Sequence, residues 1–255
     1  MTRFDHLEFD GPTEARPRTS AKGAEHYLAE AQAAFEEGDF EQALRLYGRV
    51  LEYNPHCVAA WTGQVRMLIE LERFAEAKAW ADKALEKFPR HAELLAAKGV
   101  LLARMGELQA ALSFSDAALD EDVDSPYIWL ARGDVLLARQ EKQAEFCFGK
   151  ALAMAARDWL LHWLASRIHA FYKKLAMALK YAQQALALAP TRAVVWLQLG
   201  LCQQGLGLFS AAQHSFAQAR QLNPRFAAVT AQVTAQANTG LLTRLRGVLQ
   251  QWLRP

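Results

Sequence analysis

Residues 159–255 of this chain include no acidic residues. The last of its 27 Asp and Glu residues is Asp158, and residues 159–255 carry ten Lys and Arg. Residues 1–158 contain all 27 acids and 19 basic residues, so their net charge is −8. The overall charge of +2 therefore hides an acidic first part and a basic second part. Such asymmetry is a clue about partners. It favours an acidic protein or peptide at the basic end. The alternatives are drift on a solvated face, nucleic acid or anionic lipid, and head-to-tail self-association.

Cysteine and long apolar runs are also scarce. Cys57, Cys147 and Cys202 are odd in number and share no metal-ligand spacing, which argues against a disulfide framework and a metal site. No apolar run reaches about 18 residues, so the sequence predicts no membrane span. The N-terminus lacks the apolar core of a signal peptide. These absences predict a cytoplasmic protein.

Catalytic and nucleic-acid motifs are missing as well. There is no phosphate-binding glycine loop, and His162 and His169 have no acid nearby in sequence that would make a metal site or a triad. The ten basic residues of the second part form no dense run, which argues against nucleic acid as a partner. We therefore expect no enzymatic activity, no cofactor and no metal.

The chain contains a sequence motif of roughly 34 residues that is repeated six times between about residues 24 and 224. The clearest copy consists of Trp196, Leu199, Gly200, Gly207, Phe209, Ala212, Phe216, Ala219 and Pro224. A second copy consists of Tyr27, Ala31, Gly38, Phe40, Ala43, Tyr47, Leu51 and Pro55. Four weaker copies lie between them. This spacing resembles the tetratricopeptide repeat, which implies an all-α, right-handed α-solenoid of about six helix-turn-helix units.

Each copy also reads as two amphipathic helices on physical grounds. Trp196, Leu199 and Gly200 share one helix face, and Gly207 marks a stop and reversal. The second apolar stripe then runs from Phe209 until Pro224 ends it. One such pair cannot bury its own apolar face, so neighbouring pairs must stack into a continuous core.

The repeats divide the chain into three parts. We expect a disordered tail over residues 1–22, six units over residues 23–225 and C-terminal capping helices over residues 226–255. In the tail, Phe4, Leu7 and Phe9 alternate with acids, which indicates either an unstructured segment or a docking motif for a partner or a groove of this protein. The apolar stripe over residues 241–253 is either a cap or a helix that binds a membrane or partner. The fourth unit is expected to have a short turn at residues 140–142, and the junction of units four and five to be irregular.

The family resemblance further implies that the first helix of every unit lines a concave groove. It places Leu28, Gln32, Thr62 and Arg66 among the groove positions of the first two units. Leu28 and Gln32 replace the lysine and asparagine that clamp a peptide carboxylate in chaperone-binding members, so that activity is not carried over. We expect a partner-binding groove mainly in units four to six, with arginines that orient acidic residues and apolar side chains that hold a partner segment. Its residues are Arg66, Arg104, Leu130, Leu137, Trp163, Arg167, Phe171, Leu197 and Leu201.

The functional prediction is an adaptor or scaffold that binds a protein or peptide, acidic or amphipathic in character, in the concave groove. Two alternatives remain open from the sequence. One is a chaperone for an apolar secretion or assembly substrate. The other is a structural subunit of a larger complex, tethered by its N-terminal tail.

Overall fold

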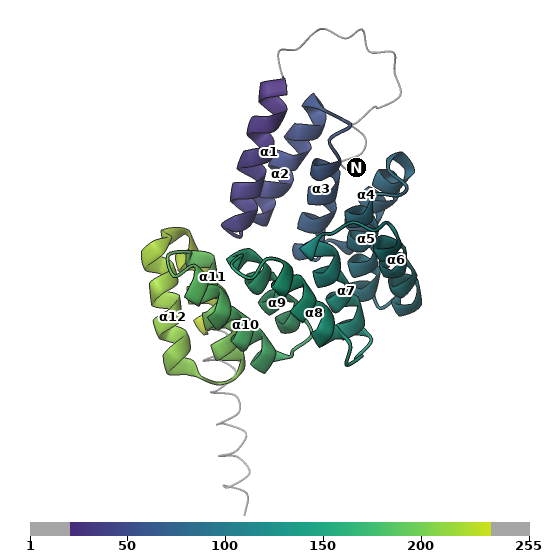
Figure 1. The fold of residues 1–255 in the computed structure, drawn as a ribbon. Helices are drawn as coiled ribbons and strands as arrows, with labels where there is room; N and C mark the ends of the chain where they lie inside the picture. Colours follow the sequence, from purple (N-terminus) through teal and green to yellow (C-terminus); the bar gives the residue numbers. More distant parts are fainter. Residues whose placement is uncertain (1–20, 236–255) are drawn as a thin grey trace, which may run out of the picture.

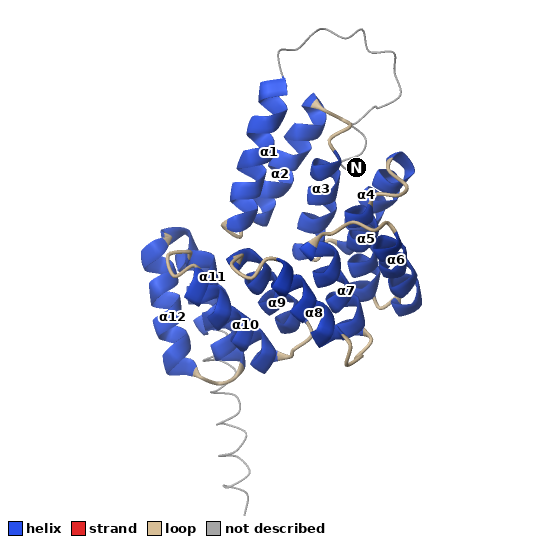
Figure 2. Cartoon of the chain, in the orientation of Figure 1, coloured by secondary structure: helices blue, strands red, loops and turns tan. Residues whose placement is uncertain are grey.

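The computed structural model describes residues 21–235, with side chains from residue 23 onward, and this part is helical apart from its turns (Figures 1 and 2). The all-α solenoid predicted from the sequence is confirmed. The proposed docking motif at Phe4, Leu7 and Phe9 and the apolar stripe over residues 241–253 lie outside the described residues.

The helices follow one another in antiparallel pairs. They are α1 (Ala21–Glu36), α2 (Phe40–Tyr53), α3 (Val58–Glu70), α4 (Phe74–Lys87), α5 (Ala92–Met105), α6 (Leu108–Asp120), α7 (Pro126–Ala138), α8 (Ala144–Met154), α9 (Trp159–Phe171), α10 (Leu175–Leu188), α11 (Ala193–Gly205) and α12 (Phe209–Leu222). A 3₁₀ turn, η2 (Pro224–Phe226), follows, and residues 227–235 are helical. Below, a unit means one such pair, from unit one (α1 and α2) to unit six (α11 and α12).

The odd-numbered helices form the inner row of the solenoid. From α3 to α11 each packs directly on the next odd-numbered helix, whereas α1 and α3 make much less contact with each other. Figure 1 shows the same separation between α1 and α3. The inner row is therefore continuous except at its N-terminal end.

Every unit turns through one residue in the left-handed region, where φ is positive. These residues are Gly38, Glu72, Gly106, Gln140, Lys173 and Gly207. Their spacing is 34 residues except between Gln140 and Lys173, which are 33 apart. The missing residue lies in unit four, as the sequence predicted. In the other units a buried alanine follows the turn residue by five positions, whereas Ala144 follows Gln140 by only four, so the residue is missing from the turn.

Glycines on the inner helices let aromatic rings of the outer helices come close. A Cβ on Gly200 would lie 2.5 Å from the Phe216 ring, and one on Gly133 would lie 2.9 Å from the Phe148 ring. Real Cβ atoms do not approach so closely, so larger side chains would push the two helices of a unit apart. The repeated glycine and phenylalanine positions thus set the spacing within units four and six.

The proline that ends a unit is tied to the tryptophan that opens the next. The indole N–H of Trp61 donates to the carbonyl of Pro55 at 2.9 Å, and that of Trp196 donates to the carbonyl of Pro190 at 2.8 Å. In both places the tryptophan follows the proline by six residues. This bond gives a structural reason for the tryptophan; its acceptor is a backbone carbonyl, so it does not require the proline.

The solenoid also closes on itself. The turn between α1 and α2 lies against α9 and α11, as Figure 1 shows at the lower ends of α1 and α2. Phe35 and Phe40 pack on Trp163, with ring centroids 6.0 and 6.1 Å apart, and a Cβ on Gly38 would lie 2.8 Å from Val194. Unit one therefore contacts units five and six across the concave side.

Candidate functional site

The inner wall of units four and five is sealed. Trp163 is 0% exposed, Leu130 is 2% exposed and Leu137 is 8% exposed. The sequence led us to expect these side chains on an open apolar groove, and the structure corrects that expectation. The reason is closure, because Phe35 from unit one covers Trp163 from the concave side. In this conformation the apolar half of the groove is core.

Two of the predicted arginines form a charged cluster in this interior. The guanidinium of Arg104 lies 2.8 Å from Asp134 and 3.8 Å from Glu70, and its side chain is 5% exposed. Arg167 donates from Nε to Glu70 at 2.9 Å, and the Tyr172 hydroxyl donates to Asp134 at 2.7 Å. We expected these arginines to orient the acids of a partner. In the structure they pair with acids of the same chain.

Burial and pairing both shape the ionisation of this cluster. Burial opposes the charge of Glu70, but Arg167 and Arg104 outweigh it and hold its pKa below the ordinary 4.5. Burial likewise opposes the charge of Arg104, and Asp134 and Glu70 raise its pKa nevertheless. Nearby, burial raises the pKa of Tyr127 to about 12. All three groups keep their ordinary charge states at neutral pH.

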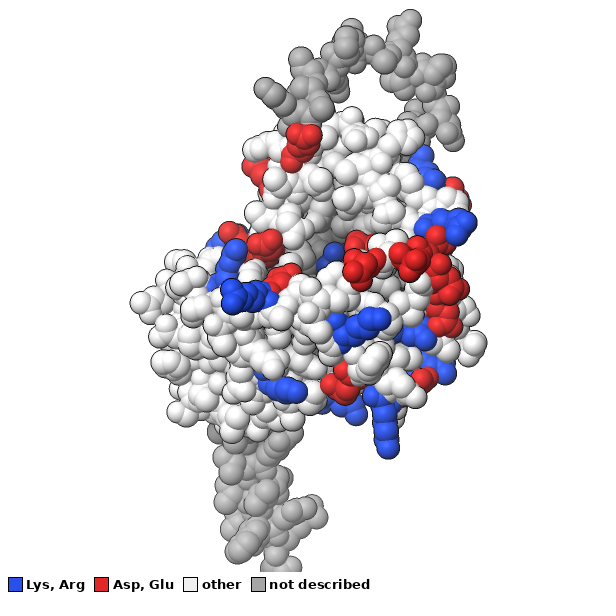
Figure 3. Space-filling view, viewed as in Figure 1, with Lys and Arg blue, Asp and Glu red and all other residues white. Residues whose placement is uncertain are grey.

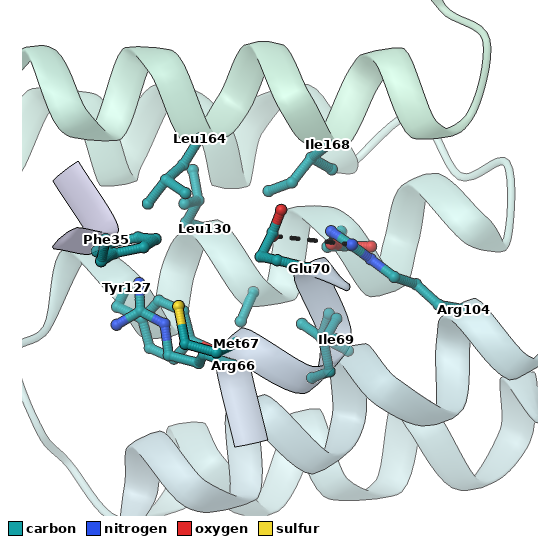
Figure 4. A pocket seen from close by; sticks show the side chains of 13 residues that line it. Phe35, Arg66, Met67, Ile69, Glu70, Arg104, Tyr127, Leu130, Leu164 and Ile168 are labelled. Carbon is teal, nitrogen blue, oxygen red and sulfur yellow. Dashed lines mark hydrogen bonds and ion pairs between the residues drawn. The ribbon is translucent and has the colours of Figure 1, made fainter. Parts of the chain in front are cut away.

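The remaining predicted positions lie around the same interior. Arg66 stacks over Tyr127 at 4.1 Å and over Phe35 at 5.2 Å, beside a small cavity of about 30 Å³ that Glu70 and Arg104 also line (Figure 4). Phe171 is half-buried, with the Arg104 guanidinium 4.7 Å from its ring centroid.

Leu197 and Leu201 differ from the sealed leucines. Both lie on α11 and remain partly exposed. The structure thus brings Arg66, Arg104, Arg167 and Phe171 close to one another and leaves Leu197 and Leu201 apart from them at the rim.

Acidic residues from the first part of the chain pair with basic residues from the second part. Arg192 lies 3.3 Å from Glu36, and Arg225 lies 3.6 Å from Glu37 and also pairs with Asp39. These pairs join the acidic first unit to the basic sixth unit and to the 3₁₀ turn that follows it. Figure 3 shows acidic and basic side chains facing one another across the middle of the molecule. We call this contact, together with Phe35 and Phe40 on Trp163, the seam.

The open part of the concave side lies in units one and two instead. A cavity of about 470 Å³ opens between α1 and α3, where these helices stand apart. Its lining is Glu25, Leu28, Ala29, Gln32, Tyr47, Ala59, Thr62, Gly63, Arg66 and Glu93. Family resemblance had pointed to Leu28, Gln32, Thr62 and Arg66, but only Arg66 was ranked among the site residues. No local signal marks this half as open, because its openness depends on where unit one folds back.

The histidines and cysteines have structural surroundings. His169 is buried between the carbonyl of Ala165 and the carboxylate of Glu145, and His162 contacts Gln184. The three cysteines are free. Over residues 21–235 no cluster of His, Cys, Asp and Glu could hold a metal ion. In the same range no helix has both the length and the apolar character needed to cross a membrane.

Comparisons with known proteins identify the family to which this repeat architecture belongs. Tetratricopeptide repeat family models match residues 28–92 and 68–135. The chain is a tetratricopeptide repeat protein. A solved tetratricopeptide repeat protein from Parabacteroides merdae is 16% identical, with 86% of each chain covered and a TM-score of 0.53. The Cut9–Hcn1 hetero-tetramer structure of the APC/C matches at 15% identity over 85% of this chain and 43% of that chain, with a TM-score of 0.51. These structures show the same fold.

Two curated relatives are distant. The BBSome complex member BBS4 of Bos taurus is 19% identical over 188 residues, which are 73% of this chain and 36% of that protein. A protein SGT1 homolog of Oryza sativa subsp. japonica is 34% identical over 83 residues, which are 32% of this chain and 23% of that protein. The chain thus spans about a third or less of either relative. The repeats support a role in protein–protein interaction and identify no specific member of the family.

Proposed function

We propose that this tetratricopeptide repeat protein is an adaptor that binds an extended segment of a partner protein in the open groove between α1 and α3. The observation that carries the proposal is the cavity of about 470 Å³ at that place, which is larger than the cavities of about 30 and 170 Å³ farther along the inner helices. Concave sites that combine apolar walls with a few placed polar groups are typical binding sites.

The lining of the groove defines what would fit. Leu28 and Ala29 on one wall and Ala59 on the other can hold an apolar side chain, whereas Gln32 and Thr62 can hydrogen-bond to the backbone of the segment. Arg66 is held by aromatic rings and makes no ion pair within the described residues. A partner carboxylate could therefore take the free donors of Arg66.

The burial of Trp163 and Leu130 favours an adaptor over a chaperone for apolar substrates, because that chaperone would need the apolar wall exposed. Three unpaired thiols suit a reducing compartment, so we place the adaptor in the cytoplasm. Trp163 would serve a partner only when the seam is open, whereas Arg104, Arg167 and Phe171 line a cavity of about 170 Å³ in the closed structure.

Site-specific photocrosslinking tests the proposal. A benzoyl-phenylalanine placed at Ala29, which is exposed in the groove, should capture a partner in the native cell, whereas the same group at the exposed Ala79 on α4 should not. Ala59→Trp should abolish the capture by filling the groove, without lowering stability. Identical products at both positions, or capture that survives Ala59→Trp, would exclude this groove as the site.

A further inference from the structure

The seam has the composition of a peptide-binding surface that is already occupied. Its occupant is the segment of residues 35–40, Phe-Glu-Glu-Gly-Asp-Phe. Phe35 and Phe40 pack on Trp163, and the Arg167 guanidinium lies 4.6 Å from the Phe40 ring centroid. Aromatic rings and arginines are the groups that dominate binding hot spots.

The acids of the segment meet arginines of the same surface. Glu36 pairs with Arg192, which also stacks 5.0 Å over Trp159, and Glu37 pairs with Arg225. The surface thus offers aromatic rings surrounded by arginines, on α9, just before α11 and just beyond α12. We call it the receptor surface, consisting of Trp159, Trp163, Arg167, Arg192 and Arg225.

Three features weaken the contact between residues 35–40 and the receptor surface. Side chains alone make it, since no backbone hydrogen bond within the described residues joins the segment to α9 or α11. A cavity of about 170 Å³ remains beside Glu36 and Arg192, and the buried indole N–H of Trp163 finds no acceptor among the described residues. Such imperfect pairing costs free energy on closure. The occupant is therefore held less tightly than the core of a unit.

A second segment of the chain has the same pattern. Residues 4–10 read Phe-Asp-His-Leu-Glu-Phe-Asp, and residues 35–41 read Phe-Glu-Glu-Gly-Asp-Phe-Glu. Both have phenylalanine at positions one and six and acids at positions two, five and seven. The spacing of the rings and of the three shared carboxylates along the chain is therefore equal. The acids of the tail segment complement Arg192 and Arg225 of the receptor surface, whereas Arg167 pairs with Glu70.

One position differs in a way that ranks the two segments. Leu7 stands where the occupant has Gly38, whose φ is +74° and whose Cβ position lies 2.8 Å from Val194. A leucine would be strained in that backbone and would overlap Val194. The tail segment must therefore adopt another backbone there, so it should bind more weakly than the occupant.

The tail is long enough to reach the seam. The chain from Asp10 to Ala21 spans up to about 36 Å when it is fully extended. Along α1 the distance from Ala21 to Phe35 is about 21 Å at 1.5 Å per residue. A partner from outside the chain is not required for occupancy.

We propose that the receptor surface around α9 and α11 recognises the pattern Phe-acid-x-x-acid-Phe, and that residues 4–9 of the chain's own N-terminal tail compete with residues 35–40 for it. When the tail binds, unit one is released and the concave wall at Trp163 becomes accessible. This proposal stands apart from the groove between α1 and α3 and does not depend on it.

The test uses a fluorescent synthetic peptide of residues 1–20 and the full chain carrying Phe4→Ala and Phe9→Ala, so that its own tail does not compete. Glu36→Gln with Glu37→Gln weakens the resident occupant and should tighten peptide binding by about tenfold, while adding Arg192→Gln and Arg225→Gln to that chain should weaken it again by about tenfold. The matched control is Arg90→Gln with Glu121→Gln, an ion pair away from the seam at 3.0 Å. It should leave the affinity within about twofold of the parent.

Two further peptides sharpen the test. A peptide with Leu7→Gly should bind more tightly than the native one, because glycine permits the backbone of the occupant. A peptide with Phe4→Ala and Phe9→Ala should not bind. The proposal is overturned if no binding appears with the Glu36→Gln and Glu37→Gln chain, or if both pairs of seam variants change affinity in the same direction. It is equally overturned if the peptide without phenylalanines binds as well as the native one.

Discussion

The two halves of the concave side differ in what covers them. In units one and two, α1 and α3 stand apart and leave a groove, whereas in units four and five the wall around Trp163 is covered by the returning turn at residues 35–40. The helices of both halves come from the same repeat, so the difference is not local. It arises because a superhelix brings one end of the chain against the other. The availability of a groove in such a solenoid is therefore a property of the whole stack.

The largest effect should come from a matched pair of substitutions in the two halves. Trp163→Ala removes a fully buried ring that packs against Phe35 and Phe40, and should cost about 3–5 kcal/mol of unfolding free energy. Ala59→Trp adds a ring to the exposed groove and should change stability by less than about 0.5 kcal/mol. Urea unfolding measures both, and equal costs would show that the two halves are equally covered.

The charged cluster behind the closed half should be nearly as sensitive. Asp134→Ala leaves the buried Arg104 guanidinium without its nearest carboxylate and should cost about 3 kcal/mol. Replacing both, as Arg104→Met with Asp134→Leu, should recover most of that loss, because this buried pair of charges is then absent. A double variant that is as unstable as the single one would contradict this account of the cluster.

Two glycines isolate the contribution of closure. Gly38 and Gly106 both have positive φ, so an alanine at either should cost about 1 kcal/mol from backbone strain. Only Gly38 also faces another unit, where the new Cβ would meet Val194, and Gly106 has nothing within 4 Å. Gly38→Ala should therefore be the more destabilising of the two in thermal or urea unfolding. Equal losses would mean that the seam adds nothing to stability.

Acid should weaken the closed half through Glu70. Its pKa is lowered in the folded chain, so its contribution to stability is present above the ordinary value of 4.5 and is lost as the pH falls through the lower folded value. The urea midpoint should fall on acidification in this range, and less steeply for Glu70→Gln. Parallel curves for the two proteins would remove Glu70 from the explanation.

The sequence predicted the stack and missed the closure for identifiable reasons. The repeat spacing and the glycines at 38, 106 and 207 are local signals, and they suffice for the helical pairs. At Glu72, Gln140 and Lys173 the left-handed turn persists without glycine, because packing of the flanking helices imposes it. Trp163 is buried by Phe35, which lies 128 residues earlier in the chain. No local periodicity encodes that meeting.

The expectation that Leu130, Leu137 and Trp163 line an open groove failed for the same reason. An exposed wall in units four to six was a sound expectation from the inner-helix positions, since these point to the concave side. The charge asymmetry was the one signal of closure, and it was read as a clue to other molecules. In the structure its clearest consequence is the set of pairs that join Glu36, Glu37 and Asp39 to Arg192 and Arg225.

Closure itself can be tested directly by cross-linking across the seam. Glu37→Cys and Thr191→Cys place two exposed thiols on either side of it, in a chain whose half-buried Cys57 is replaced by serine. A short bis-maleimide should join them within one chain much faster than it joins Glu37→Cys to Gln213→Cys on α12, and Arg192→Glu with Arg225→Glu should slow the reaction. Equal rates for the two thiol pairs would show that unit one does not rest on units five and six.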